Sequence, residues 1–440
     1  MTRHQIIAIT LCFLLNMVDG YDVLVMPFAA PGIADEWGVG NVLLGYLLSG
    51  SLIGMAIGSF LLAPLADFIG RRNLTLVALS ISIIGMGLSI FAGGPTELLA
   101  YRIIAGIGIG GMISNLSIVV NEYSNEQHRG VAVGIFTAGY PIGATAGGAL
   151  AGVLIANYGW REAFVLGTIL PAVLLVLCVI WLPESYDYLV EKGGPRSLTK
   201  LNKVLEKLGQ EPVTEIPQIA KPDASRAWRE VIRRDKLPQT LLAWVGYSLL
   251  TLAFYFANSW TPTIIEQQSG SSSLGTWTTV LFNFGGALGS AVFGIVAIKV
   301  ASRRLLVFTL IAAAIFYALF GTLIDNVPAA MVVGVFSGLA ATAGIAGIYS
   351  IGPALYGTAA RGSGMGALIG VGRLVSIAAP IAVGYLLTAG FTPSQVFQTF
   401  ALPLLISAGL FVLLGTVRKR RGLDPQPRIK ATDDPVPTPA

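Results

Sequence analysis

The sequence predicts an all-α integral membrane protein with twelve transmembrane helices in two pseudo-symmetric six-helix halves. Of its 440 residues, 54% are hydrophobic and 12% are charged, and the mean hydropathy is +0.73. Soluble domains carry roughly 25% charged residues. Apolar stretches of about 20 residues, long enough to cross a bilayer, recur along the chain. An internal repeat divides these stretches into two sets of six.

Twelve apolar stretches give the expected spans. They cover 5–33, 42–66, 73–93, 96–121, 130–156, 161–182, 239–265, 273–299, 304–324, 328–355, 362–389 and 393–417. The first has the basic start and apolar run of a signal peptide. Because the run continues to Ile33 and more spans follow, we expect it to be retained as a helix.

Polar segments divide the chain into four parts. We expect an N-terminal six-helix half at 1–183, a cytoplasmic central loop at 184–238, a C-terminal half at 239–417 and a disordered Pro-rich tail at 418–440. The central loop contains LTKLNKVLEKLG, whose apolar residues recur at helical spacing. This pattern predicts a short amphipathic helix between the two halves.

Basic residues gather on one side of the expected spans. That side would carry the central loop, the tail and Arg3, Arg71, Arg72, Arg129, Lys299, Arg303, Arg304 and Arg361. Arg161 alone would lie on the other side. The asymmetry predicts a multi-pass protein of the plasma (inner) membrane with both termini in the cytoplasm. Because the inner leaflet explains the net charge of +5, we expect no nucleic-acid partner.

The internal repeat appears at two places with nearly the same offset along the chain. In the first repeat alignment, GSFLLAPLADFIGRRNL from Gly58 matches GSAVFGIVAIKVASRRL from Gly289. In the second repeat alignment, RGVAVG from Arg129 matches RGSGMG from Arg361. Related halves joined in parallel, with a site between them near the middle of the bilayer, are typical of transporters.

Two carboxylates, Asp19 and Asp22, lie near the middle of the first span and share one helix face. An ionised carboxylate at that depth costs roughly 2.5–3.5 kcal/mol, so each must face a cavity or a partner or be protonated. Burial and a nearby like charge both favour the protonated form. We therefore expect the pair to carry protons. The alternative is a structural pair bonded to arginine or to helix ends.

Two arginines also fall within spans. Arg373 lies about 12 residues into its span, near the midplane, and its planar guanidinium suits a carboxylate. It predicts an anionic substrate, and the alternative is a permanent ion pair with Asp19 or Asp22. Arg102 either reaches Asp22 or binds backbone carbonyls and holds the bundle, and we group it with Arg373 as a candidate substrate-binding residue. Glu122 lies about 30 Å further along that helix, where it would form a gate contact with loop basic residues, part of a proton exit or a structural contact.

Uncharged polar residues are also expected near mid-depth. They are Tyr140, Tyr255, Asn258 and Asn283. Aromatic faces and amides suit a ring that bears hydroxyls, although each residue alone is better explained by packing. The sequence GIGIGG follows no strand, so it predicts close helix packing and no dinucleotide site. With two cysteines and two histidines in no metal spacing or nucleophile set, we expect no metal, no cofactor and no enzyme activity.

Several motifs resemble known family signatures. APLADFIGRR, RIIAGIGIGG and LPES resemble those of the major facilitator superfamily, and DGYD, NEYSNEQHRG and SWTPTII resemble its aromatic acid:proton symporter family. The resemblance implies that transport requires the DGYD aspartates and that the charges of Arg102, Glu122, Arg361 and Arg373 are shared by the family. The residues matching the loop motif for conformational switching are Asp67, Gly70, Arg71 and Arg72, and we group Arg361 with them. The loop motif departs from its usual pattern at Ala63, Phe68 and Ile298.

We therefore expect a monomeric secondary transporter that imports a hydroxybenzoate-like aromatic carboxylate with protons by alternating access. Its expected partners are the small carboxylate, protons and the lipid bilayer. A proton-coupled symporter of a non-aromatic carboxylate or sugar acid, and a proton-coupled exporter, remain as alternatives. A membrane enzyme and a non-transporting sensor on the same fold are rivals from other classes.

Overall fold

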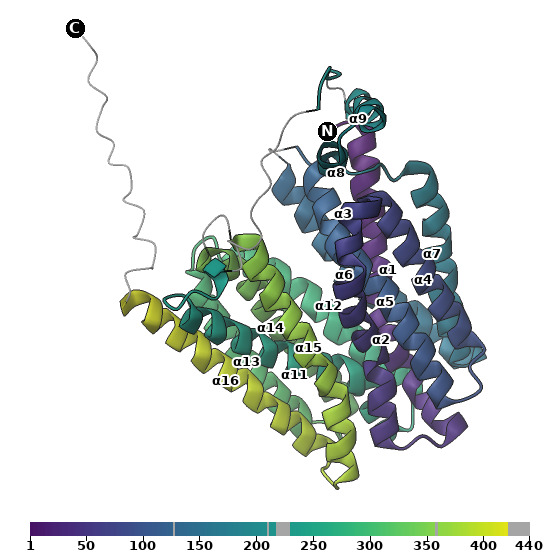
Figure 1. Cartoon of the computed structure of the whole chain (residues 1–440). Helices are drawn as coiled ribbons and strands as arrows, with labels where there is room; N and C mark the ends of the chain where they lie inside the picture. The colour runs from purple at the N-terminus through teal and green to yellow at the C-terminus, as the bar shows by residue number, and fades with distance from the viewer. Residues whose placement is uncertain (126–127, 209–210, 217–228, 357–359, 421–440) are drawn as a thin grey trace.

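The structure is a computed structural model that describes residues 1–125, 128–208, 211–216, 229–356 and 360–420. Within these residues the chain is helical and contains no strand. Twelve helices are long and apolar enough to cross a membrane, which confirms the predicted fold class. They form two groups that lean against each other (Figure 1).

The first group contains the N-terminal six of these helices. They are α1 (Arg3–Trp37), α2 (Asn41–Leu61), α4 (Arg71–Ile90), α5 (Pro95–Tyr123), α6 (Arg129–Tyr158) and α7 (Arg161–Trp181). The second group contains the remaining six. They are α11 (Leu237–Ser269), α12 (Ser272–Val296), α13 (Ser302–Thr322), α14 (Val327–Ile351), α15 (Arg361–Thr388) and α16 (Pro393–Arg420).

Short helices connect these spans at the end of the molecule that carries both termini, here called the terminal end. They are η1 (Ala63–Leu65), α3 (Ala66–Ile69), α8 (Tyr186–Lys192), α9 (Pro195–Leu208) and η2 (Gly352–Leu355). Helix α9 contains the amphipathic pattern predicted for the central loop. Its residues Leu201 and Leu205 are buried against the first group, so the central loop is anchored to the N-terminal half.

In two expected spans the α-helix stops four or five residues before the predicted end. The helix expected at 42–66 ends at Leu61, and the helix expected at 328–355 ends at Ile351, although the membrane-span segment of the latter continues to Leu355. Each is followed by a short 3₁₀ turn that contains a proline, Pro64 or Pro353. Proline lacks a backbone N–H and cannot donate the i→i−4 hydrogen bond that would continue the helix, so the α-helix stops there. At the other end of the chain, α16 continues to Arg420, and the rest of the expected tail lies outside the described residues.

The repeat predicted from sequence is visible in how glycines let helices touch. In the first half, a Cβ on Gly54 would lie 2.1 Å from the carbonyl oxygen of Ile103. In the second half, a Cβ on Gly285 would lie 2.0 Å from the carbonyl oxygen of Val335. Gly58 and Gly289 repeat the arrangement one turn further on, against α5 and α14. Glycine permits this close approach in both halves, so the α2–α5 contact recurs as the α12–α14 contact.

The two halves meet at the end opposite the terminal end, here called the closed end. The Ser49 hydroxyl of α2 donates to the carbonyl of Ile377 in α15 at 2.9 Å, and a Cβ on Gly45 would lie 2.6 Å from the carbonyl oxygen of Pro380. Gly152 of α6 is packed in the same way against Thr276 of α12. All these contacts lie in the parts of the helices that are far from the two ends of the chain.

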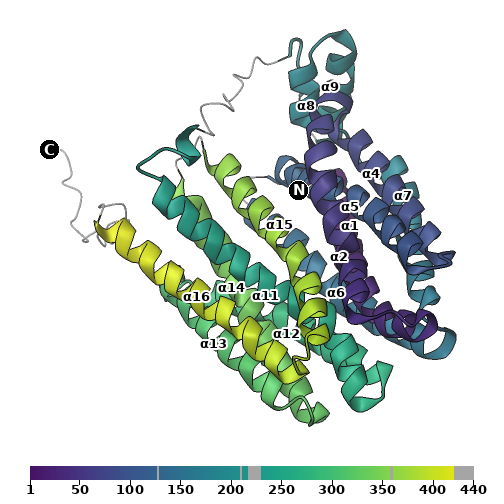
Figure 2. The same ribbon diagram turned by 60° about the horizontal axis from the view of Figure 1, so that its bottom comes forward.

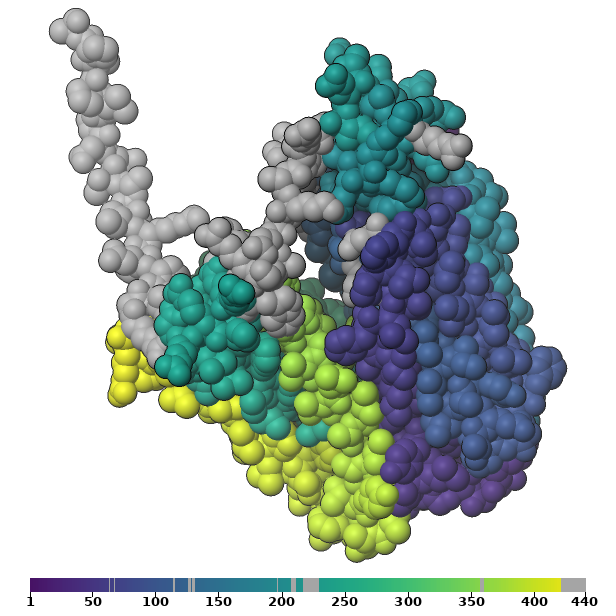
Figure 3. Space-filling model, in the orientation of Figure 1, coloured from purple at the N-terminus to yellow at the C-terminus, as the bar shows by residue number. Residues whose placement is uncertain are grey.

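At the terminal end the halves separate. The space-filling view shows contact between the halves near the closed end and a hollow between them near the terminal end (Figure 3). A view turned by 60° shows the same divergence of the helix ends (Figure 2). The hydrophobic core agrees, because its largest cluster joins both halves whereas the cluster beneath α8 and α9 belongs to the first half alone. The hollow therefore leads from the terminal end toward the middle of the bundle.

Candidate functional site

Asp22 is held in a buried ion pair with Arg102. The guanidinium of Arg102 donates to Asp22 Oδ1 at 2.9 Å and to Oδ2 at 3.2 Å, and it also donates to the backbone carbonyl of Asp22 at 2.8 Å. Both alternatives raised for Arg102, a contact with Asp22 and a contact with backbone, therefore hold together. The side chains are 1% and 0% exposed, so the pair is closed to solvent on both sides.

Neighbouring side chains complete the surroundings of this pair. The Ser51 hydroxyl donates to Asp22 Oδ2 at 2.9 Å, and the guanidinium of Arg102 lies 5.7 Å from the ring centroid of Phe164. Bidentate geometry and added hydrogen bonds are what allow an ion pair to persist out of water. Arg102 thus balances the charge of Asp22 within the first half.

Asp19, one turn earlier on α1, has a different environment. It is 3% exposed, and its Oδ1 has no hydrogen-bond partner within the described part of the chain. Gly20 beside it is so close to α6 that an added Cβ would lie 2.1 Å from the carbonyl oxygen of Tyr140. This contact places Tyr140 next to Asp19. A buried carboxylate oxygen without a donor is costly, which makes Asp19 the unsatisfied member of the pair.

Arg373 faces Asp19 from the other half. Its side chain is partly exposed, and its guanidinium makes no hydrogen bond or ion pair with any residue that the structure describes. Asp19 lies within its electrostatic range, together with three tyrosine hydroxyls. The permanent ion pair considered as an alternative is therefore absent among the described residues. Arg373 lies one turn before Ile377, the residue that contacts α2, so it sits where the hollow meets the closed end.

Three tyrosines of the second half surround Arg373. They are Tyr247, Tyr255 and Tyr349. The hydroxyls of Tyr247 and Tyr349 are 3.2 Å apart. The Tyr247 ring packs against Gly372, where an added Cβ would lie 2.4 Å from it, and Tyr349 is 43% exposed. Three tyrosine hydroxyls thus lie within electrostatic range of a cation that has no ion-pair partner among the described residues.

Sequence reasoning found Tyr255 but missed Tyr247 and Tyr349. A signal for Tyr247 existed, because Tyr247, Thr251 and Tyr255 recur every four residues and so share one face of α11. Thr251 donates its hydroxyl to the carbonyl of Gly372 at 3.2 Å, which shows that this face meets α15. Nothing in the sequence indicates that Tyr349 reaches the same place from α14.

The two predicted amides lie together but are largely satisfied by the protein. Asn283 donates to the amide oxygen of Asn258 at 2.9 Å and to the carbonyl of Thr279 at 3.0 Å. Asn258 donates to the carbonyl of Phe254 at 3.0 Å. The amides are 3% and 4% exposed. This arrangement joins α11 to α12.

A second charged network lies at the terminal end of the first half. Arg71 Nε is 3.3 Å from Glu122 Oε1, which is the loop contact considered for Glu122. Glu122 also accepts from the Ser185 hydroxyl at 2.9 Å and from the backbone N–H of Tyr186 at 3.1 Å. The network therefore ties α4 and α5 to the start of α8.

Glu184 extends this network to the remaining switch residues. It accepts a hydrogen bond from the backbone N–H of Arg72 at 2.9 Å. Gly70 has a φ of 95°, and an added Cβ would lie 2.4 Å from Glu184 Oε2, so glycine is required there. Arg361 is exposed at the start of α15, and the side chain of Asp67 lies outside the described part of the structure.

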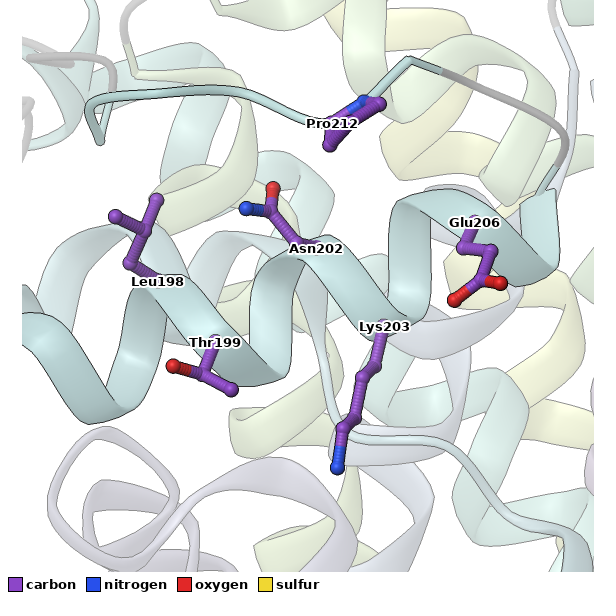
Figure 4. Close-up of a pocket in the computed structure, with 6 residues that line it drawn as sticks. All are labelled: Leu198, Thr199, Asn202, Lys203, Glu206 and Pro212. Atoms are coloured by element: carbon purple, nitrogen blue, oxygen red, sulfur yellow. The ribbon is translucent and has the colours of Figure 1, made fainter.

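A further hollow of about 670 Å³ lies on α9, outside the membrane-spanning helices. Figure 4 shows it between α9 and the segment at Pro212, with the Asn202 side chain pointing toward that segment. Asn202 exchanges two hydrogen bonds with the backbone of Val213, at 3.0 and 2.9 Å. These bonds fold the central loop back on α9. The hollow is far from Asp19 and Arg373 and contains neither.

A twelve-helix bundle with repeated halves, a hollow open at one end and unpaired charges where the halves meet defines a secondary transporter. The chain belongs to the Major Facilitator Superfamily, whose family model matches residues 9–276 and 243–438. This family is one of transporters, which agrees with the expectation that the protein is no enzyme.

Curated relatives extend over nearly the whole chain. A gallate transporter of Pseudomonas putida is 30% identical over 436 residues, covering 95% of this chain and 93% of the relative. The 4-hydroxybenzoate transporter PcaK of the same species is 28% identical over 424 residues, covering 95% and 94%. Among solved structures, a D-xylose-proton symporter has a TM-score of 0.73 at 17% identity, covering 92% and 97%. The inward open xylose transporter XylE of Escherichia coli has a TM-score of 0.72 at 16% identity, covering 91% and 94%.

Proposed function

We propose that this protein imports an aromatic carboxylate into the cell by proton symport. The observation that carries the proposal is Arg373, a partly exposed residue close to the contact between the halves, whose guanidinium has no ion-pair partner among the described residues. A forked cation in that position fits a carboxylate bidentately. The names of the relatives, a gallate transporter and a 4-hydroxybenzoate transporter, support the same class of substrate.

Coupling to protons follows from the position of Asp19. Ionised Asp19 partly neutralises Arg373 across the seam, whereas protonated Asp19 leaves the guanidinium with its full charge for the substrate carboxylate. A proton and the carboxylate therefore bind better together than apart. Coupling energies between sites are typically 1–3 kcal/mol, or about 5–150-fold in affinity. We assign the exchangeable proton to Asp19 because Asp22 is already balanced by Arg102.

The distribution of basic residues supports placing the terminal end in the cytoplasm. With that orientation, the hollow opens to the cytoplasm and the structure corresponds to an inward-facing state. Alternating access then requires the closed end, held by contacts such as Ser49 to Ile377, to open toward the outside. Substrate would enter with its carboxylate at Arg373 and leave toward the terminal end.

The tyrosines around Arg373 favour an aromatic substrate over a sugar acid. Tyr255 offers an aromatic face beside the guanidinium, and the hydroxyls of Tyr247 and Tyr349 can each exchange a hydrogen bond with a ring hydroxyl. A sugar acid would need more polar groups than this wall provides. We therefore expect 4-hydroxybenzoate to compete for uptake more strongly than a sugar acid of similar size.

The decisive test is uptake of 4-hydroxybenzoate into proteoliposomes under an imposed pH gradient. Asp19→Asn should abolish gradient-driven accumulation but retain exchange of labelled for unlabelled substrate, because the neutral amide mimics the protonated carboxyl. Asp35→Asn, an exposed carboxyl near the end of the same helix, is the matched control and should accumulate normally. Full accumulation by Asp19→Asn would refute the proton role.

Substrate contact is tested separately at Arg373. Hydrogen bonds to charged groups contribute about 1.5–3 kcal/mol, so Arg373→Ala should weaken binding of 4-hydroxybenzoate by about 10–150-fold. The methyl ester, which lacks the carboxylate charge, should bind both proteins alike. Arg304→Ala, at an exposed arginine of the same half, should change neither affinity. Unchanged binding of the acid by Arg373→Ala would remove Arg373 from the site.

A further inference from the structure

A basic groove lies on the outside of the second half, away from the site at the seam. It has a volume of about 530 Å³ and lies between the start of α13 and the end of α16, which run side by side in both ribbon views (Figures 1 and 2). Three basic side chains line the part of the groove nearest the terminal end. They are Arg303, Arg304 and Lys419. Val307 and Val412 line it further along the same helices.

The second half, which carries this groove, is poor in acidic residues. Between 237 and 420 the only acidic residues of the sequence are Glu266 and Asp325, and both lie at the closed end. In the first half, by contrast, Arg71 of the first repeat copy is neutralised by Glu122, and the guanidinium of Arg72 donates to the backbone carbonyls of Leu182 and Val179. The tail beyond 420 carries equal numbers of acidic and basic residues. The region around the groove is therefore positive overall.

The depth and chemistry of the groove match one kind of occupant. Its basic residues lie at helix ends, where a span leaves the bilayer, and Val412 below them is 54% exposed on the outer surface. The first turn of α13 also directs the positive end of its helix dipole toward this level. A phosphate at the helix ends would bind the basic side chains, and its acyl chain would cover the exposed Val412.

We propose that this groove binds the headgroup of an anionic phospholipid of the leaflet that faces the terminal end. Arg304 and Lys419 are exposed and supply the charge. Arg303 is held in place by packing over Gly415, where an added Cβ would lie 2.5 Å from its guanidinium carbon. Basic pockets between transmembrane helices are established sites for lipid phosphates. The lipid would brace α13 against α16.

The test is lipid binding to the full chain by native mass spectrometry, with phosphatidylglycerol and phosphatidylethanolamine as the two probes. The wild-type protein should retain phosphatidylglycerol preferentially. Each basic side chain near an anionic headgroup contributes about fivefold in affinity. Arg304→Gln/Lys419→Gln should therefore bind phosphatidylglycerol about 25-fold more weakly, and phosphatidylethanolamine as before.

The matched control removes two exposed charges from the same end of the molecule but outside the groove, Arg3→Gln/Lys299→Gln. It should keep the wild-type preference. Equal losses in the two double variants would overturn the proposal, because they would show a general surface attraction. Competition by millimolar glycerol phosphate as strong as that by the lipid would also overturn it, in favour of a free anion. Size-exclusion profiles of both variants check that each is folded.

Discussion

The two halves of the molecule repeat their backbone contacts but not their charges. When the first repeat alignment is extended along the chain, Pro31 of α1 falls on Pro262 of α11, and Asp22 falls on Ala253. The backbone carbonyl at this last position accepts a hydrogen bond in both halves. In the first half the donor is the guanidinium of Arg102, at 2.8 Å, and in the second it is the hydroxyl of Tyr317, at 3.3 Å. The carbonyl needs a donor in either half, but only the first half uses a charged one.

This difference divides the charges at mid-depth between the halves. The first half contributes Asp19, Asp22 and Arg102, a net charge of −1 when both carboxyls are ionised, and the second half contributes Arg373. The sum is zero when the site is empty and Asp19 is ionised. Protonation of Asp19 leaves one positive charge, which a substrate carboxylate balances. A symmetric protein with the same charges in both halves would not offer this exchange.

The two halves should differ most in stability when their two donors are removed in turn. Arg102→Met leaves Asp22 buried and unpaired, which should cost about 3–5 kcal/mol of stability. Tyr317→Phe removes one neutral hydrogen bond and should cost about 1 kcal/mol. Thermal unfolding of the purified protein in detergent, followed by loss of the monomer peak in size-exclusion chromatography, measures both. Equal losses would show that the charge at Arg102 is unimportant for folding.

A double variant separates the effect of the charges on stability from their effect on transport. Asp22→Leu/Arg102→Met removes both charges and makes the first half resemble the second, where small and apolar residues occupy these positions. Replacing a buried ion pair by apolar residues is often neutral for stability, so the double variant should recover most of the stability lost in Arg102→Met. Transport by this variant then reports on Asp22 separately from folding. Normal gradient-driven uptake would leave Asp19 as the proton carrier, and loss of uptake would return Asp22 to that role.

A next, smaller effect should be the same in both halves. A Cβ on Gly106 would lie 2.2 Å from the carbonyl oxygen of Ser51, and one on Gly338 would lie 1.8 Å from that of Phe282. Gly106→Ala and Gly338→Ala should each cost about 1–3 kcal/mol, because overpacking forces the helices apart. Thermal unfolding of the two variants is the measurement. A loss in only one half would contradict the repeated packing.

The repeat also supplies the controls for these glycine variants. Gly134 and Gly366 are paired by the second repeat alignment, and neither has an atom within 4 Å of an added Cβ. Gly134→Ala and Gly366→Ala should therefore keep the wild-type unfolding temperature or raise it slightly, because alanine favours a helix over glycine.

The fold was predictable from the sequence because it depends on composition and length. Apolar stretches and loop charges set all twelve spans, and the errors lie at span ends such as Leu61, where a proline shortly afterwards stops the helix. The repeat was readable because glycine contacts such as Gly58 tolerate no other residue. These signals are local in the chain, or recur at a fixed offset.

The site was only partly predictable because it depends on partners that lie far apart in the chain. Asp19, Asp22, Arg102 and Arg373 were visible as charges in apolar spans. Sequence alone left open whether Arg102 would reach Asp22 or bind backbone carbonyls, since that depends on the depth and rotation of α1 against α5. Tyr349 carried no signal at all, because a tyrosine near a span end is common and its contact with Tyr247 joins α14 to α11.

The smallest expected effect tests the charged network of the first half, whose glutamate has no acidic counterpart at the matching position of the second half. In the second repeat alignment, extended toward the N-terminus, Glu122 falls on Ala354. Glu122→Gln weakens the contacts to Arg71 and to Ser185, and loss of a partly exposed ion pair costs about 1 kcal/mol or less. The initial uptake rate should fall about two- to fivefold with KM nearly unchanged, because the network anchors α8 and does not touch the substrate. Initial rates measured over a range of substrate concentrations separate the two quantities.

Glu215→Gln, at an exposed carboxyl of the central loop, is the matched control and should transport at the wild-type rate. If Glu122→Gln instead loses accumulation under a pH gradient while exchange continues, Glu122 belongs to a proton exit. That outcome would extend the proton pathway from Asp19 to the terminal end. A changed rate with intact coupling keeps Glu122 in the anchor, and confines the chemistry of transport to the seam where the charges of the two halves differ.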